Sequence, residues 1–320
     1  MRVLVTGGCG YIGSCTVRHL AEAGHEVLIL DNLSTGHRRL AGNFELIEGD
    51  IADRELVAKC LKRSDAVMHF AASAYVGESV TNPRKYFRNN VESGLALLDE
   101  VLASPVRLFV FSSSCAVYGV PAALPITETL PREPISPYGA TKLFFERILA
   151  AYSVAHGLRS ASLRYFNAAG AHASGEIGEL HDPETHLLPL AIQAALGTAP
   201  PLKVFGANFN TLDGTCIRDY IHVSDLATAH IRALEYLAAG GDTVALNLGT
   251  GHGSSIREII KLIQELTGRN LPHEFVDARP GDPPALFASP EKAKELLGWH
   301  AVHDLKSILN SAILWEKNKA

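Results

Sequence analysis

A glycine loop between an apolar run and an amphipathic stretch, near the start of the chain, most constrains its fold. Residues 2–13 read Arg-Val-Leu-Val-Thr-Gly-Gly-Cys-Gly-Tyr-Ile-Gly, with Gly7, Gly10 and Gly13 at three-residue spacing. Such glycines permit a tight turn, close approach of the backbone to a pyrophosphate and close helix–strand packing, while the helix N-terminus offers free N–H groups. A second apolar run ends at Asp31, whose carboxylate suits ribose hydroxyls and repels a 2′-phosphate. The loop predicts NAD rather than NADP; a glycine turn without a ligand is the plainer alternative.

The first half of the chain alternates short β-branched runs with longer amphipathic stretches. This alternation is typical of βαβ units and predicts an α/β fold with a doubly wound parallel (Rossmann) sheet. The expected core strands are Val3 to Val5, Val27 to Leu30, Ala66 to Phe70, Leu108 to Ser112 and Ser160 to Arg164.

Beyond Phe166 the pattern breaks into a stretch rich in glycine and proline. We expect a smaller, discontinuous C-terminal α/β lobe to begin there. Asp219 to Val223 and Ala245 to Leu248 again look like strands, so the chain is expected to return to the first domain. The expected division is 1–168 plus about 209–248 for the NAD-binding domain, and about 169–208 plus 249–320 for the lobe.

Composition excludes several classes of protein. The 320 residues, 47% of them hydrophobic, can supply a full core, and 29 basic against 34 acidic residues give no basic excess for nucleic-acid binding. No apolar run reaches the roughly 20 residues of a membrane span. Residues 1–6 read as a strand rather than a signal peptide. Five scattered cysteines predict neither disulfides nor a zinc site but reduced thiols, hence a cytoplasmic protein, and the histidines show no metal-ligand spacing.

A second motif, Ser136-Pro-Tyr-Gly-Ala-Thr-Lys142, lies at the start of a long amphipathic stretch. Ser136 suits an N-cap, so Tyr138 and Lys142 fall one turn apart on one helix face. A cationic Lys142 would lower the pKa of the Tyr138 phenol from about 10, giving a base for an alcohol proton. The upstream strand ends in a serine run at Ser114, which could bind the same substrate oxygen. A chance Tyr/Lys pair and a structural serine remain the alternatives.

The G-x-x-G-x-x-G spacing and the ordered serine, tyrosine and lysine resemble the extended short-chain dehydrogenase/reductase family. That resemblance implies that Ser114, Tyr138 and Lys142 are catalytic. It also implies an NAD site, whose residues would be Gly7, Gly10, Tyr11, Ile12, Gly13, Asp31, Asn32, Asp50, Ile51, Phe70, Ala71, Ala72, Asn89, Tyr138, Lys142 and Phe166.

Further segments narrow the resemblance to the branch that epimerises UDP-hexoses at C4. They are Val76-Gly-Glu-Ser79, Asn89-Asn90, Leu163-Arg-Tyr-Phe-Asn167, Gly170-Ala-His172, Arg218-Asp-Tyr-Ile-His222 and Gly281-Asp282. The resemblance implies that Tyr138 is the acid and base, that Ser114 steadies or relays the proton, and that Lys142 holds the nicotinamide ribose. Tightly bound NAD would be reduced and reoxidised in each turnover, with a 4-keto sugar between, to interconvert UDP-glucose and UDP-galactose.

The resemblance assigns the nucleotide sugar to the smaller lobe. The implied substrate residues, besides Ser114 and Tyr138, are Asn167, Leu187, Phe205, Arg218, Tyr220, Arg279 and Asp282. Three positions depart from the family pattern. Ala116 replaces a threonine, Ala74 replaces a lysine near the cofactor phosphates, and Leu286 stands where a tyrosine narrows some sugar pockets.

Other functions stay open at this point. A 4-epimerase of a UDP-pentose, uronic acid or N-acetylhexosamine would use the same chemistry. A 4,6-dehydratase needs an acidic pair where Cys115 and Ala116 stand, and an NAD-sensing binding protein would not need the triad. Apolar residues from Tyr86 to Leu102 and on the helix after Tyr138 (Phe144, Phe145, Ile148, Leu149 and Tyr152) predict a homodimer or a buried intrachain role.

Overall fold

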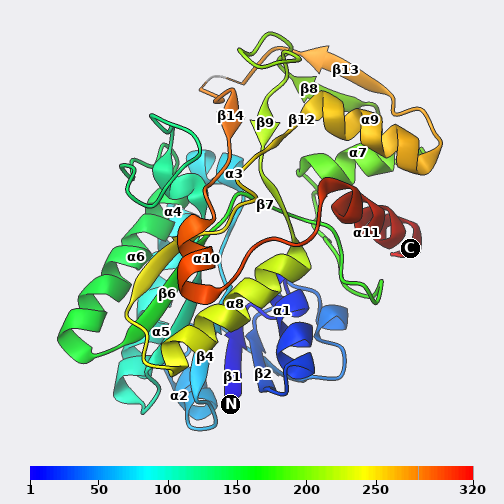
Figure 1. Ribbon diagram of the computed structural model, residues 1–320. Helices are drawn as coiled ribbons and strands as arrows, with labels where there is room; N and C mark the ends of the chain where they lie inside the picture. The colour runs from blue at the N-terminus through cyan, green and yellow to red at the C-terminus, as the bar shows by residue number, and fades with distance from the viewer. Residues whose placement is uncertain (280, 320) are drawn as a thin grey trace.

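Seven parallel strands form the main sheet of the computed structural model, which describes residues 1–279 and 281–319. Their order is β11-β6-β5-β4-β1-β2-β3 (Figure 1). The strands are β1 (Arg2–Thr6), β2 (Glu26–Asp31), β3 (Glu45–Glu48), β4 (Ala66–His69), β5 (Leu108–Ser112), β6 (Arg159–Arg164) and β11 (Val244–Asn247). From β1 the chain first adds β2 and β3 on one side and then β4, β5, β6 and β11 on the other, so the strand order reverses between β1 and β4. Ligands bind at this point in doubly wound sheets.

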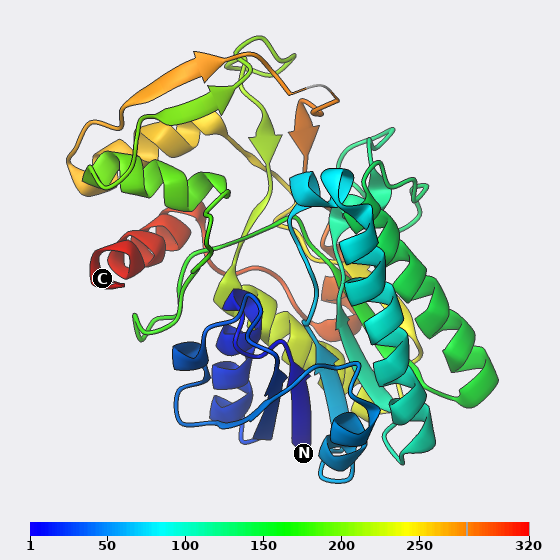
Figure 2. The same ribbon diagram turned by 180° about the vertical axis from the view of Figure 1, so that it is seen from behind.

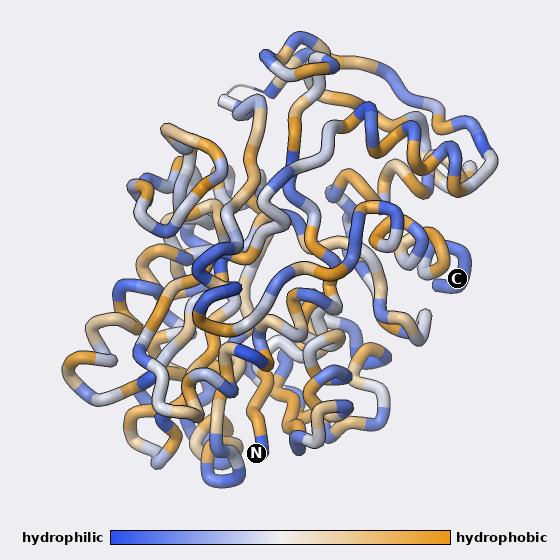
Figure 3. The backbone as a smooth tube through the Cα atoms, viewed as in Figure 1, coloured by the Kyte–Doolittle hydropathy of each residue, from blue (hydrophilic) through white to orange (hydrophobic). Residues whose placement is uncertain are grey.

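Helices cover both faces of this sheet (Figures 1 and 2). One face carries α1 (Tyr11–Glu22) and α8 (Val223–Ala238), and the other carries α2 (Arg54–Leu61), α5 (Ser93–Ala103) and α6 (Pro137–His156). Successive side chains of a strand point to opposite faces. Val3 and Val5 therefore join one core, whereas Leu4 joins the other with Phe145 of α6. The apolar character of β1 shows as orange beside the N-terminus in Figure 3.

The doubly wound sheet and its five predicted core strands are confirmed. The predicted strand Ala245 to Leu248 corresponds to β11, which pairs with β6. Among the seven strands of the main sheet, β3 alone is missing from the prediction. Its sequence, Glu-Leu-Ile-Glu, has two apolar residues and lies at the sheet edge with no residue fully buried, so its pattern is weak.

The predicted strand Asp219 to Val223 is only partly correct. β10 (Tyr220–His222) is a strand, but it pairs with β7 (Asn167–Ala169) in a separate two-stranded sheet, and Val223 begins α8. A three-residue strand carries no signal for which sheet it joins, so the pairing is a tertiary outcome.

A second core lies above the carboxyl ends of the main strands (Figure 1). It is built by α7 (Leu187–Leu196), α9 (Ile256–Thr267), α11 (Leu305–Asn318) and the parallel pair β8 (Leu202–Phe205) and β13 (His273–Val276). A small sheet, in the order β12-β9-β14, joins β12 (Ser254–Ser255), β9 (Ile217–Arg218) and β14 (Ala285–Leu286). The remaining elements are α3 (Val76–Thr81), α4 (Pro83–Tyr86), α10 (Glu291–Leu297) and the non-α turns η1 (Arg38–Ala41), η2 (Phe87–Glu92) and η3 (Cys115–Tyr118).

The packing differs from the expected domain boundaries in two places. α10, expected in the smaller lobe, packs on α8 and β11, and Ala293 and Leu297 belong to the core of the main sheet. β9, expected in the NAD-binding domain, pairs only with strands of the small sheet. Amphipathic segments of this length do not specify which of two cores they cover.

Two further observations concern the part of the chain that the structure describes. None of its helices combines the length and apolarity needed to cross a membrane. All five cysteines are free and buried.

Candidate cofactor and active site

The glycine loop forms a cradle at the carboxyl end of β1. Gly7 has φ +74°, and a Cβ there would lie 2.5 Å from the backbone nitrogen of Ala71. A Cβ on Gly13 would lie 2.2 Å from the carbonyl oxygen of Gly7. Gly10 caps α1 without any side-chain hydrogen bond, so the first N–H groups of the helix stay available to an anion. The cradle fits a dinucleotide pyrophosphate.

Asp31 is buried and held at the carboxyl end of β2. Its Oδ2 accepts a hydrogen bond from the Cys9 backbone N–H at 2.8 Å, and its Oδ1 accepts one from the Leu33 N–H at 2.9 Å. Beside it, Asn32 Nδ2 donates to Asp50 Oδ2 at 2.8 Å. Each carboxylate oxygen keeps a second lone pair, which suits the predicted contact with ribose hydroxyls.

The loop after β4 closes the cradle and is tied to α6. Ala71 abuts Gly7, and the Asn90 side chain accepts from the Ser73 N–H at 2.8 Å and donates to Thr141 Oγ1 at 3.1 Å. Asn89, a predicted cofactor residue, donates to Asn90 Oδ1 at 3.1 Å. Asn90 is not among the residues predicted for the site, although it belongs to the Asn89-Asn90 pair of the family pattern. Its buried bridging position identifies it as a residue that positions this loop.

Tyr138 and Lys142 lie in the first turns of α6, as predicted. The Ser136 side chain caps the helix by accepting from the Gly139 N–H at 3.1 Å. Lys142 Nζ donates to the Ser112 carbonyl at 2.7 Å and lies 5.7 Å from the centroid of the Tyr138 ring. Ser114 follows β5 and caps η3. The predicted triad is therefore gathered at the strand end beside the glycine cradle.

The ionisation of this pair differs from the expectation. Desolvation raises the pKa of Tyr138 to about 12, although interaction with the Ser114 hydroxyl offsets part of the rise. Desolvation also lowers the pKa of Lys142 to about 7, although the Glu146 carboxylate opposes that change. The predicted lowering of the Tyr138 pKa by Lys142 is wrong for the protein alone, because burial raises that pKa and the opposing effect comes from the Ser114 hydroxyl.

A buried ion pair that was not predicted from the sequence lies one helical turn from Lys142. Arg164 of β6 contacts Glu146 through two hydrogen bonds of 2.9 and 2.6 Å. Ser113 Oγ donates to Glu146 at 2.6 Å, and Arg164 donates to the Tyr118 hydroxyl at 2.6 Å. The Glu146 network therefore ties α6, β5, β6 and η3 together directly behind the triad.

The predicted substrate residues form a second group on the smaller lobe. Arg218 of β9 pairs with Asp282 at 2.8 Å, and the guanidinium of Arg279 lies 4.0 Å from the centroid of the Phe205 ring. Asn167 is committed elsewhere, since its side chain donates to the Asp219 carbonyl at 2.8 Å and closes the β7–β10 pair.

The other predicted substrate residues and the three departures are also placed. Tyr220 is buried in the core of the lobe, and Leu187 begins α7 at the rim of the same core. Leu286 packs with Phe166 against η3, which contains Ala116, and Ala74 is exposed.

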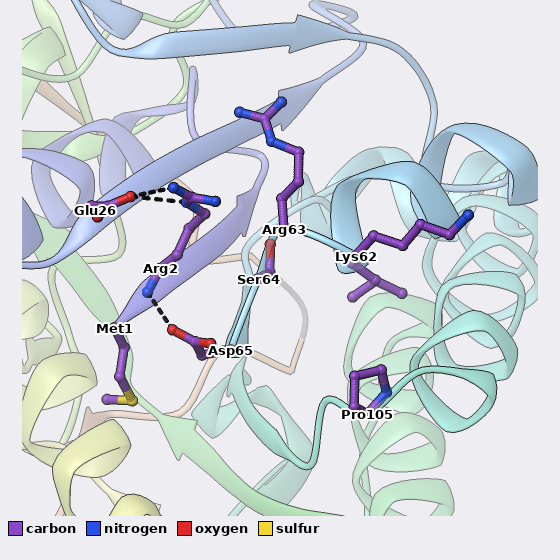
Figure 4. Close-up of a pocket in the computed structure, with 9 residues that line it drawn as sticks. Met1, Arg2, Glu26, Lys62, Arg63, Ser64, Asp65 and Pro105 are labelled. Atoms are coloured by element: carbon purple, nitrogen blue, oxygen red, sulfur yellow. Dashed lines mark hydrogen bonds and ion pairs between the residues drawn. The ribbon is translucent and has the colours of Figure 1, made fainter.

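An open polar hollow lies at the opposite, amino end of the strands (Figure 4). There Arg2 pairs with Glu26, and its backbone N–H donates to Asp65 at 2.7 Å. In parallel α/β sheets the ligand sites lie at the carboxyl ends. None of the predicted site residues lines this hollow.

The fold and the glycine cradle together define a dinucleotide-binding protein of the Rossmann class. A model of the NAD dependent epimerase/dehydratase family matches residues 3–249. UDP-glucose 4-epimerase of Rhizobium leguminosarum bv. trifolii is 50% identical over 315 residues, which cover 98% of this chain and 96% of the relative.

Solved structures that resemble this chain also come from proteins named UDP-glucose 4-epimerase. UDP-glucose 4-epimerase from Brucella ovis, in complex with NAD, is 52% identical with a TM-score of 0.96, covering 98% of this chain and 97% of that one. The enzyme from Stenotrophomonas maltophila, with bound NAD and formylated UDP-arabinopyranose, is 41% identical with a TM-score of 0.97, covering 100% and 98%. The chain belongs to the NAD dependent epimerase/dehydratase family.

Proposed function

We propose that this chain interconverts UDP-glucose and UDP-galactose by epimerisation at C4 of the hexose. The observation that carries the proposal is the convergence of Tyr138, Lys142 and Ser114 with the glycine cradle at one edge of the sheet. Relatives named UDP-glucose 4-epimerase, similar over nearly the whole chain, support the substrate.

The residues of the cradle and of the β2 end would hold NAD, which when bound accepts a hydride from C4 and later returns it. Tyr138 would take the C4 hydroxyl proton and return it to the same oxygen, whichever face of the ring that oxygen then lies on. Lys142, fixed by the Ser112 carbonyl, would stabilise the phenolate. Ser114 would hold the C4 oxygen and relay the proton. Ala116 offers no hydroxyl, so this contact depends on Ser114.

The lobe would bind the UDP moiety through Arg218 and Arg279, together with their partners Asp282 and Phe205. Arginine forks match phosphate oxygens. Arg218 already spends one N–H on Asp282 and another on the Ile217 carbonyl, so its orientation is set before a ligand arrives. Tyr220 and Leu187 would contribute apolar walls. Asn167 would act chiefly by positioning β10, because its amide is already bonded within the protein.

UDP-pentoses, UDP-uronic acids and N-acetylated UDP-sugars remain candidate substrates. The bound formylated UDP-arabinopyranose of the Stenotrophomonas maltophila structure shows that a relative holds a UDP-pentose. Leu286, which is shorter than the tyrosine that narrows some sugar pockets of the family, would leave more room at the sugar end. A 4,6-dehydratase is disfavoured because Cys115 and Ala116 offer no acid; burial raises the pKa of the Cys115 thiol far above its usual range.

The test is a coupled assay in which purified protein receives UDP-galactose and UDP-glucose is measured. We expect conversion without added NAD, because the cofactor should stay bound through turnover. No conversion by protein that carries NAD would overturn the proposal. Parallel assays with UDP-xylose, UDP-glucuronate and UDP-N-acetylglucosamine rank the substrates, and a much faster rate with one of them would reassign the sugar.

We further propose a homodimer in a reducing, cytoplasmic compartment. On the outer side of α6, Phe144 is 46% exposed and its ring centroid lies 6.3 Å from that of Phe87, which is 39% exposed. Phe145 and Leu149 are buried against the sheet, which is the intrachain role that the sequence left open as the alternative. The five buried free cysteines suit the compartment.

We also propose two functional units, an NAD-binding domain and a nucleotide-sugar lobe, largely within the expected boundaries. The packing supports assigning α10 to the NAD-binding domain and β9 to the lobe.

A further inference from the structure

Two glutamates and two histidines converge in the segment that leads into α7. They are Glu179, His181, Glu184 and His186, and one ligand atom of each lies within 4.8 Å of all the others. His186 Nδ1 lies 2.8 Å from Glu179 Oε1 and 3.0 Å from Glu184 Oε1. His181 Nδ1 lies 3.2 Å from Glu179 Oε1 and 3.8 Å from Glu184 Oε2. We name these four residues the α7 cluster.

The separations match the edges of a metal coordination sphere. Zinc binds imidazole nitrogen and carboxylate oxygen at about 2.0–2.2 Å, so neighbouring ligand atoms of a tetrahedral site lie about 3.3–3.5 Å apart. Three of the four separations, 2.8, 3.0 and 3.2 Å, are shorter than that value, and the fourth, 3.8 Å, is longer. Two carboxylates also balance the charge of a divalent ion, and imidazole nitrogen favours zinc over magnesium or calcium.

A second observation concerns His181, whose Nδ1 is buried and makes no hydrogen bond with acceptable geometry. A buried donor or acceptor without a partner costs about 1–3 kcal/mol, so such an atom calls for an explanation. Nδ1 lies at ion-pair distance from the carboxylates of Glu179 and Glu184 but makes a hydrogen bond of acceptable geometry with neither. A metal ion at the centre of the cluster would give this nitrogen its missing partner.

The surroundings hold the α7 cluster in place. The Tyr75 ring packs beside both imidazoles, with centroids at 5.7 and 6.3 Å, and its hydroxyl donates to the Pro183 carbonyl. Trp315 of α11 donates to the Glu179 carbonyl at 2.9 Å. The Glu179 side chain is only 8% exposed. The His186 side chain is 49% exposed and leaves an entry path for an ion.

We propose that the α7 cluster is a structural site for a divalent transition metal of the zinc type. The ion would crosslink residues 179–184 to the residue before α7 and stabilise this segment between Tyr75 and α11. None of its four residues belongs to the Ser114, Tyr138 and Lys142 triad, and His186 directly precedes Leu187, a predicted substrate residue.

Metal binding can be measured directly on the whole protein after chelator treatment. We expect equilibrium dialysis against Zn²⁺ to give one ion per chain, with a dissociation constant below about 1 µM. Co²⁺ in its place should give the visible absorption of a tetrahedral nitrogen and oxygen site. Absence of binding by the wild-type protein would overturn the proposal and leave an imidazolium–carboxylate cluster. Thiolate charge-transfer absorption would also overturn it, because a cysteine would then be the ligand.

Matched variants locate the ion. His181→Asn and Glu184→Gln should each weaken Zn²⁺ binding by about 100-fold or more, since each removes one ligand. His300→Asn changes an exposed histidine outside the α7 cluster and should bind as the wild type does. Far-UV circular dichroism checks that each variant is folded. Unchanged binding in both ligand variants, or equal loss in His300→Asn, would overturn the assignment.

Discussion

At the carboxyl end of β5, burial moves two neighbouring side chains away from their ordinary ionisation. Tyr138 is harder to deprotonate than a free tyrosine, and Lys142 is easier. A phenol of high pKa is a poor base near neutral pH, so the site works only once positive charge is fixed beside the ring. A cationic Lys142 and a bound nicotinamide ring of NAD would supply that charge.

Replacing Tyr138 by phenylalanine removes the proton acceptor while keeping the ring. We expect kcat for UDP-galactose to fall by about 10²–10⁴-fold, with NAD still bound, because only the acid–base step is lost. Tyr152→Phe is the matched control, because Tyr152 is half-buried on the same helix but lies near the end of α6 that is remote from Tyr138. Steady-state kinetics and cofactor content measure the two effects. Near-normal turnover of Tyr138→Phe would place the base elsewhere.

We expect the buried His69 side chain to make the folded protein less stable in acid. Burial lowers its pKa to about 3, with a further contribution from Lys142, so the folded state keeps the ring neutral while the unfolded chain protonates near pH 6.5. Stability is therefore full above about pH 6.5 and is lost as the pH falls toward 3.

At pH 4.5 we expect this residue alone to cost about 2–3 kcal/mol of unfolding free energy relative to pH 7. His69→Gln keeps a polar partner for Thr6, whose hydroxyl lies 2.7 Å from His69 Nδ1. The variant should lose that part of the pH dependence in urea titrations of the cofactor-free protein. An unchanged difference between the two pH values would refute the assignment.

Among the elements, the contact between α6 and β5 determines where the triad lies. Tyr138, Lys142 and Glu146 follow one another at four-residue spacing and face Ser112, Ser113 and Ser114 at the strand end. Since Glu146 and Arg164 are both buried, their ion pair fixes the register of the helix against the sheet.

Removing one member of this pair leaves the other charge buried and uncompensated. We expect Glu146→Leu or Arg164→Met alone to lower the unfolding free energy by about 3–5 kcal/mol. The double variant should lose less than the sum of the single losses, because no charge then stays buried. Denaturant titrations of the four proteins measure the coupling. Additive losses would contradict this account.

The turn between β1 and α1 makes a separate prediction. Gly13→Ala would place a methyl group 2.2 Å from the Gly7 carbonyl oxygen, so the cradle must open. Gly77→Ala, in α3, meets nothing within 4 Å and serves as the control. We expect Gly13→Ala alone to weaken NAD binding by at least about tenfold, measured by fluorescence titration of stripped protein. Equal affinity in both variants would show that the cradle does not set cofactor binding.

At the scale of the whole molecule, the smaller lobe lies over the carboxyl ends of the strands of the main sheet. The main sheet supplies the glycine cradle and the triad, and the smaller lobe supplies Arg218, Arg279 and their neighbours. The outer side of α6 and η2 is left with exposed aromatic rings, which is the face we assign to a second copy.

Phe144→Asp tests that face. We expect the variant to shift toward monomer in light scattering, because a charge would be buried in an apolar interface. Val154→Asp is the control, since Val154 lies on the same helix and is 91% exposed. A wild-type protein that is monomeric, or a dimer unaffected by Phe144→Asp, would contradict the proposed interface.

The sequence by itself determined the parallel sheet, the glycine loop with Asp31, and the turn of α6 that carries Tyr138 and Lys142. These features depend on periodicity and on residue types within short segments, which local physical chemistry specifies. The tertiary structure decided what depends on distant neighbours. Burial reversed the expected pKa of Tyr138, packing drew α10 onto the main sheet, and folding paired Glu146 with Arg164.

The α7 cluster stands between these two cases. Its four residues lie within one short segment, but the spacing Glu-x-His-x-x-Glu-x-His matches none of the common zinc motifs, so no metal site was predicted from the sequence. Only the bend of the chain before α7 brings the four side chains together. Desolvation and long-range pairing arise when separate elements pack, and no short window of sequence contains them.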